Sequence, residues 1–88
     1  MMNPKVRSVQ PLPPHRLLLE FSNGEQRIFD VGPYLSRGIF AALRDPNVFG
    51  AARVIAGSVE WPGDIDLSYD TLYLESVPNE KKLPQSVA

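Results

Sequence analysis

The amino-terminal third of the chain alternates between apolar and polar residues over short runs separated by prolines and glycines. Residues 5–9 form the first run, with Val6 and Val9 apolar and the basic side chains on one face. This pattern predicts a short edge strand. Prolines crowd residues 11–14 immediately afterwards. They are typical of a stiff connector between strands, although a polyproline ligand for a partner domain is the alternative.

The next two runs are predicted to form a β-hairpin around Asn23-Gly24, since this dipeptide tolerates the positive φ angles of a two-residue type I′ turn. A two-residue loop fixes the pairing, so that Glu20 faces Arg27 and Leu19 faces Ile28. We expect four side chains on the core face: Leu17, Leu19, Phe21 and Ile28. In this register Leu18 opposes Phe29 on the other face.

Helical signals follow the first hairpin. Ser36 is a candidate N-cap for a short helix running to about Arg44, with Ile39, Phe40 and Leu43 on one stripe. Asp45-Pro46 marks a second helical start, because an acidic N-cap followed by proline suits the first turn.

A second hairpin is predicted around Ala56-Gly57, between residues 52–55 and 58–61. A two-residue turn places Arg53 opposite Glu60. We therefore predict an α+β fold, a small antiparallel sheet of two hairpins plus an N-terminal strand, packed by a short helical segment. One domain is expected over residues 1–77, with a flexible tail at 78–88.

The amino-acid composition excludes several kinds of functional site. The 88 residues include no cysteine and one histidine, and the net charge is −1. Disulfides, thiolate metal sites and a poly-histidine metal site are excluded within one chain. Residues 1–53 carry seven basic and four acidic residues, whereas residues 54–88 carry two basic and six acidic ones. No apolar run approaches a membrane span and no signal peptide is apparent, so we expect a cytoplasmic prokaryotic protein without membrane contact.

An acidic segment after the second hairpin resembles a calcium-binding loop, with Asp64, Asp66 and Ser68 at the first, third and fifth positions. Tyr69 replaces the glycine that such loops need at the sixth position. We therefore expect no metal, and interpret the aspartates as turn residues, with Asp70 capping a turn that begins at the next residue.

Other catalytic and cofactor motifs are missing. His15 could be combined with Asp30 and a serine into a triad, but no nucleophile motif supports it. No glycine-rich phosphate-binding loop occurs, so no cofactor and no catalytic residue are predicted. The net charge makes nucleic acid an unfavoured partner, and a DNA-associated protein using Lys5, Arg7 and Arg16 is kept as an alternative.

Trp61 has two interpretations. At the end of a strand it could be an exposed binding anchor, because tryptophan is enriched at interfaces. The favoured interpretation packs it against the helix that carries Phe40 and Leu43, because a small core depends on its aromatic residues.

Several of these residues, in order, resemble the prokaryotic domain of unknown function 2442 family between about Val6 and Glu75. The matching residues are Gly38-Ile39-Phe40, Leu43, Asp45, Phe49, Trp61-Pro62-Gly63-Asp64, Asp66-Leu67 and Leu72-Tyr73. The resemblance implies a small α+β domain, free-standing or fused to a helix-turn-helix, and no established activity. It also implies genes that neighbour small partner genes in a toxin–antitoxin-like layout.

We therefore expect a small non-enzymatic protein-interaction module, antitoxin-like in role, that meets a small basic protein encoded nearby. The candidate interaction surface comprises Trp61, Asp64, Asp66, Asp70 and Tyr73. A homodimer through an edge strand is a further expected partner arrangement. The alternatives are a DNA-associated regulatory protein and a metal-dependent or acid–base enzyme that uses the acidic loop.

Overall fold

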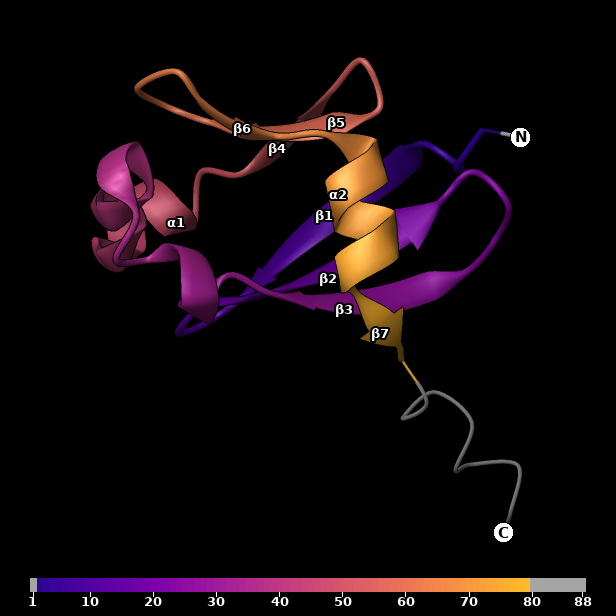
Figure 1. The fold of residues 1–88 in the computed structure, drawn as a ribbon, viewed down its shortest axis with the longest axis horizontal. Helices are drawn as coiled ribbons and strands as arrows, with labels where there is room; N and C mark the ends of the chain where they lie inside the picture. The colour runs from indigo at the N-terminus through magenta and orange to yellow at the C-terminus, as the bar shows by residue number, and fades with distance from the viewer. Residues whose placement is uncertain (1, 80–88) are drawn as a thin grey trace, which may run out of the picture.

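Two antiparallel sheets face each other in a computed structural model that describes residues 2–79 (Figure 1). Sheet A has the order β1-β2-β3-β7, with β1 (Val6–Leu12), β2 (Arg16–Phe21), β3 (Gln26–Asp30) and β7 (Val77–Pro78). Sheet B has the order β4-β5-β6, with β4 (Arg53–Ile55), β5 (Ser58–Trp61) and β6 (Ile65–Leu67). The α+β class is confirmed, and the strands form two sheets where the sequence predicted one.

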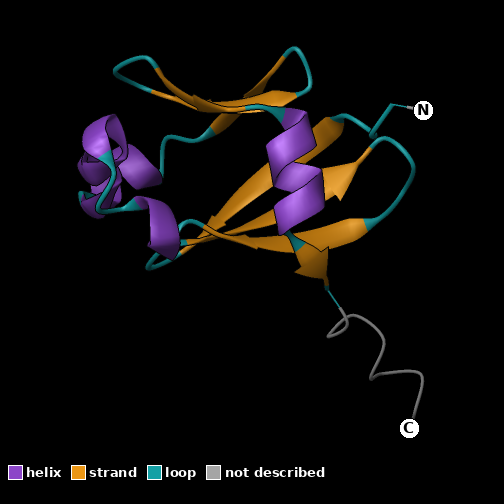
Figure 2. Cartoon of the chain, in the orientation of Figure 1, coloured by secondary structure: helices purple, strands orange, loops and turns teal. Residues whose placement is uncertain are grey.

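The short helices occupy two places (Figure 2). Two 3₁₀ helices and a single α-helical turn gather at one end: η1 (Gly32–Tyr34), η2 (Gly38–Arg44) and α1 (Pro46–Phe49). The longer α2 (Tyr69–Glu75) contacts both β3 of sheet A and β5 of sheet B. The helix therefore closes one side of the space between the sheets.

The register predicted for the first hairpin is wrong by one residue. Leu19 pairs with Arg27 and Leu18 pairs with Ile28. Gly24 has a φ of +89°, whereas Asn23 does not enter the left-handed region. A type I′ turn needs positive φ at both central residues, so the chain forms a three-residue loop in which glycine alone is left-handed.

A one-residue change of register moves the side chains of β3 to opposite faces. Phe29 is therefore buried in the core, and Ile28 lies with Leu18 on the outer face of sheet A. The expected Glu20–Arg27 pair does not form, and Glu20 lies 3.8 Å from Arg7 instead. Leu17, Leu19 and Phe21 are buried as predicted.

The second hairpin has the predicted register. Arg53 pairs with Glu60, and their side chains form a salt bridge of 3.3 Å. Ala56 and Gly57 have φ angles of +51° and +84°, as a type I′ turn requires. The strand β6 extends this hairpin where the sequence predicted only an acidic loop, because Ile65 and Leu67 alternate with Asp66 and point into the core.

The helical predictions are partly right. Asp45 caps α1, since its carboxylate accepts the Asn47 N–H at 2.9 Å. Ser36 caps nothing in the structure, because Gly38 has a φ of +47° and interrupts any right-handed helix begun earlier. Ile39 is 58% exposed and does not join the expected apolar stripe.

The sequence predicted no helix or strand in the carboxyl-terminal part of the chain, and a flexible tail from residue 78. Leu72 is buried on α2, and Val77–Pro78 pairs with β3 as the last strand of sheet A. The Asn79 N–H donates to the Gln26 carbonyl at 2.9 Å. The remainder of the predicted tail, residues 80–88, lies outside the described residues. Within residues 2–79, no helix is long and apolar enough to cross a membrane.

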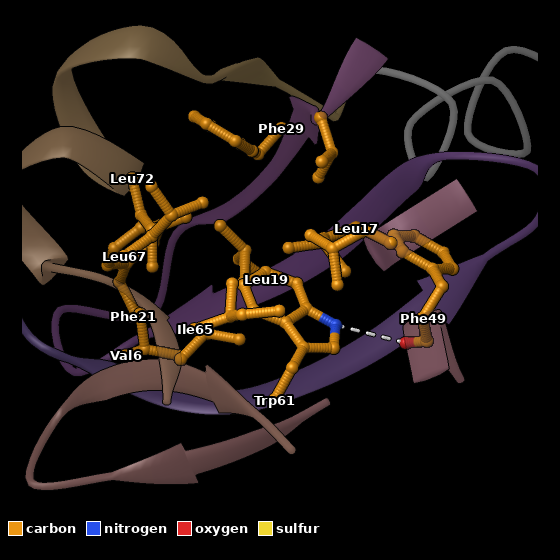
Figure 3. Close-up of a cluster of buried hydrophobic side chains, with 13 residues drawn as sticks. Val6, Leu17, Leu19, Phe21, Phe29, Phe49, Trp61, Ile65, Leu67 and Leu72 are labelled. Carbon is orange, nitrogen blue, oxygen red and sulfur yellow. Dashed lines mark hydrogen bonds between the residues drawn. The ribbon is translucent and has the colours of Figure 1, made fainter. Parts of the chain in front are cut away.

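The core fills the space between the sheets, with α2 on one side and the helical cluster at one end (Figure 3). Thirteen apolar residues are buried: Val6, Leu17, Leu19, Phe21, Phe29, Val31, Leu43, Phe49, Val59, Trp61, Ile65, Leu67 and Leu72. Both sheets contribute, so neither covers its apolar face without the other.

Candidate interaction surface

Trp61 belongs to the core and is absent from the surface. Its side chain is 1% exposed, and its ring lies nearly parallel to that of Phe49, with 6.5 Å between the centroids. The indole N–H donates to the Phe49 carbonyl at 3.1 Å, as the dashed line in Figure 3 shows. An exposed anchor at this position is therefore wrong. Trp61 is buried, as the favoured interpretation expected, but its ring partner is Phe49 of α1, where the helix carrying Phe40 and Leu43 was expected.

The three aspartates of the candidate surface follow one another along the chain without converging. Asp64 lies in the β5–β6 turn with a φ of +63°, Asp66 is exposed on β6, and Asp70 is in the first turn of α2. Within residues 2–79, no group of three acidic or histidine side chains is arranged to hold a metal ion. The cap of α2 is Ser68, whose hydroxyl accepts the Thr71 N–H at 3.3 Å. Asp70 was expected in that role.

Tyr73 lies between α2 and sheet A in a network of charged groups. Its hydroxyl donates to Glu25 at 2.7 Å, and the Arg27 guanidinium lies 4.7 Å from the centre of its ring. The Tyr73 hydrogen bond, with a smaller contribution from Arg27, lowers the pKa of Glu25 below its ordinary value. The same hydrogen bond raises the pKa of Tyr73.

Arg27 completes this network from the sheet side. Its guanidinium donates to the Ser76 hydroxyl and the Ser76 carbonyl, each at 2.7 Å, and to Glu25 at 3.0 Å. Among the described residues, no buried side-chain nitrogen or oxygen lacks a partner. These polar groups therefore satisfy one another and stabilise the contact between α2 and sheet A.

The basic residues of the DNA-binding alternative are dispersed. Arg7 lies beside Glu20 near one end of β2, and Arg16 begins β2 at the other end. Lys5 lies 5.7 Å from the ring centre of Tyr69. They form no single basic patch.

His15 does approach Asp30, with 2.9 Å between Nδ1 and Oδ1. The Gly32 N–H donates to the same carboxylate at 2.8 Å, and together with His15 it lowers the pKa of Asp30. A Cβ on Gly32 would lie 2.9 Å from Asp30, so glycine permits this approach. Ser8, one serine that such a triad could use, pairs with Glu20 at the far end of the sheet.

The feature that sequence reasoning missed is the outer face of sheet A. Sheet B and α2 cover the other face, and no described element lies on the outer one (Figures 1 and 2). Leu18, Ile28 and Val77 stand in one cross-strand row on this outer face. Leu18 and Ile28 are half-buried, and Val77 is 59% exposed. We call this surface the open face.

A shallow hollow of about 380 Å³ runs along the open face. Its apolar wall is formed by Leu12, Leu18, Ile28, Val77 and Pro78, and Arg16 and Asn79 supply its polar groups. Exposed apolar side chains scattered singly are ordinary, whereas a contiguous row with a polar rim is typical of an interaction site.

Comparison with known protein families identifies the family of this chain. A family model described as protein of unknown function (DUF2442) matches residues 6–78. The chain belongs to the DUF2442 family. The resemblance inferred from the sequence is thereby confirmed. No curated protein and no solved structure matches the chain.

The residues by which this DUF2442 chain resembles its family determine the fold. Phe49, Trp61, Leu67 and Leu72 are buried, and Asp45 caps α1. None of them lies on the open face. The resemblance therefore supplied no signal for this surface, and an alternation of polar and apolar residues over 16–20, read with the correct register, is the signal that would have found it.

Proposed function

We propose that this DUF2442 protein is a non-enzymatic protein-interaction module that binds another folded protein through the open face. The supporting observation is the row of Leu18, Ile28 and Val77, which no described element covers (Figure 1), on a domain in which every buried side-chain nitrogen and oxygen of residues 2–79 has a partner. A flat apolar row with charged residues at its border suits a protein surface better than a small molecule, which favours enclosed pockets.

Photo-crosslinking in the native cell tests this function. The photoreactive residue p-benzoylphenylalanine replaces Val77 on the open face or, as the matched control, Ile55 on the outer face of sheet B. Both are exposed β-branched residues on strands, at 59% and 44% exposure. We expect a discrete protein adduct from position 77 that disappears when Leu18→Lys is added. Adducts of equal abundance from position 55 would overturn the proposal.

A second hypothesis, which uses a surface other than the open face, is an antitoxin-like role in the cytoplasm of a prokaryotic cell. It is supported by the family resemblance and by the exposed carboxylates of Asp64, Asp66 and Asp70, which suit a small basic partner encoded nearby. Co-expression with the product of the adjacent gene tests it. A partner that binds equally well to a chain carrying all three aspartates as asparagine would contradict a role for these groups.

A further inference from the structure

We propose that the open face binds a second copy of this chain, with the two A sheets packed face to face. This inference rests on the proposed function, since it names the partner of the same surface. Aligned sheets pack about 10 Å apart, with their side chains interdigitated. The hollow beside Leu18 and Ile28 offers space for the apolar side chains of the opposing copy.

The outward side chains of β2 give the open face its self-complementary character. They read Arg16, Leu18 and Glu20, which places a cation, an apolar group and an anion in a line. A second copy of this line, reversed in direction, sets each Arg16 against the partner's Glu20 and the two Leu18 side chains against each other. One sequence pattern thus supplies both halves of the interface, as a two-fold interface requires.

The charges also select the orientation of the two-fold axis. Face-to-face packing requires an axis in the plane between the sheets, running either across the strands or along them. An axis across the strands, over the row of Leu18, Ile28 and Val77, reverses β2 and pairs opposite charges. An axis along β2 would set Arg16 against Arg16 of the partner and would form no Arg16–Glu20 pair, although Asp30, opposite each Arg16 on β3, reduces the repulsion.

The alternative way to form a dimer is strand addition, in which edge strands of two copies pair. The edges of sheet A are poorly suited to it. Strand β1 contains Pro11 and a bulge between Val6 and Ser8, and the Val6 N–H already donates to the Gly57 carbonyl. Strand β7 has two residues, one of them Pro78. Prolines, bulges and very short strands are the means by which sheet edges resist pairing. Within sheet A, self-association is therefore favoured at the face over the edges.

Reversing the charges of Arg16 and Glu20, separately and then in a mixture, tests this arrangement of the two copies. The variants Arg16→Glu and Glu20→Arg each set like charges together twice in a homodimer, so each should raise the dimer dissociation constant about tenfold or more. An equimolar mixture restores both ion pairs in a heterodimer and should regain most of the lost affinity; Arg7, which lies 3.8 Å from Glu20 in the unchanged chain, remains beside the new arginine and limits full recovery. Sedimentation velocity over a concentration series measures this. Arg53→Glu, in an exposed pair on sheet B, is the matched control and should leave association unchanged.

The outcomes separate this inference from the proposed function. A chain that stays monomeric up to about millimolar concentration, while position 77 yields an adduct with a different protein, overturns the second copy and keeps the interaction module. A dimer whose reversed variants are not rescued by mixing overturns the arrangement. An adduct confined to residues 80–88 of the same chain, or none at all, overturns both. An adduct of twice the chain mass, together with rescue on mixing, supports both.

Discussion

The backbone conformation of single residues decides much of this fold. Gly24 is left-handed and Asn23 is not, and this difference alone adds a residue to the first loop and sends Ile28 to the open face. At the second turn, Ala56 and Gly57 are both left-handed and the two-residue loop survives. The residue types at the two turns therefore predicted that both hairpins form. They predicted the correct strand register only for the second hairpin, at Ala56-Gly57.

The two glycines differ in a way that substitution can measure. Both have positive φ, but only at Gly57 would a Cβ also meet another side chain, 2.8 Å from the Lys5 Cβ. We expect Gly24→Ala to lower the free energy of unfolding by about 1–2 kcal/mol through backbone strain, and Gly57→Ala to cost more. Urea denaturation measures both. Equal losses would mean that Lys5 moves aside freely.

Trp61 is the residue whose truncation should cost the core most. Trp61→Ala removes the largest buried ring and leaves the Phe49 carbonyl without the indole donor. We expect the free energy of unfolding to fall by about 3–5 kcal/mol, whereas Ile55→Ala on the surface should change it by no more than about 0.5 kcal/mol. Chemical denaturation followed by circular dichroism tests this. A loss near 1 kcal/mol would contradict tight packing around the indole.

At the scale of elements, α2 connects the two sheets and is the part that sequence reasoning recognised least. Its apolar face is formed by Tyr69, Leu72 and Tyr73, at the three- and four-residue spacing of a helix. The acidic residues before it suggested a loop and obscured that spacing. Its N-cap is Ser68, so the helix begins where a hydroxyl accepts the free N–H of Thr71 in the first turn.

Removing this cap should weaken the whole domain. We expect Ser68→Ala to lower the free energy of unfolding by about 1 kcal/mol, since the Thr71 N–H loses its side-chain acceptor. Asp70→Ala, at the residue that the sequence suggested as the cap, should cost less because, among residues 2–79, Asp70 accepts a hydrogen bond only from the exposed Asn3 side chain. Thermal melts of the two variants compare them directly. The reverse order would show that the helix begins later than described.

The Glu25–Tyr73 contact should make stability depend on pH in acid. The pKa of Glu25 is lowered in the folded chain, so its stabilisation is complete above the ordinary value of 4.5 and is lost as the pH falls through the folded value. Tyr73→Phe removes the main cause of the lowering. We therefore expect this variant to lose less stability than the unchanged chain between about pH 5 and pH 3.

Urea midpoints measured across this pH range provide the test. Tyr69→Phe, four residues earlier on the same helix, is the matched control and should follow the unchanged chain. Parallel curves for Tyr73→Phe and the unchanged chain would show that the hydrogen bond does not govern the titration of Glu25.

For the whole molecule, the two sheets share one core, so they should unfold together. The fluorescence of Trp61, on sheet B, and far-ultraviolet circular dichroism, which reports all elements, should give the same urea midpoint. Separate midpoints would mean that sheet B opens while sheet A persists. Such a result would be inconsistent with a core in which Leu19 of sheet A and Trp61 of sheet B are both fully enclosed.

The sequence was sufficient for the class, the family, the second hairpin and the cap at Asp45, because each depends on signals a few residues apart. It was insufficient for the open face. Leu18, Ile28 and Val77 meet only after three strands have paired in the correct register, and Val77 is 49 residues from Ile28. The candidate surface chosen from residue types included Trp61, which the fold places inside.

The edge strands of sheet A also limit the size of any assembly of this chain. With Pro11 on one outermost strand of sheet A and Pro78 on the other, hydrogen bonding along sheet A is hindered from continuing into another chain. The open face, once it is covered by a second copy, has no room for a third. Concentrating this protein should therefore yield closed pairs that saturate, rather than fibres that lengthen without limit.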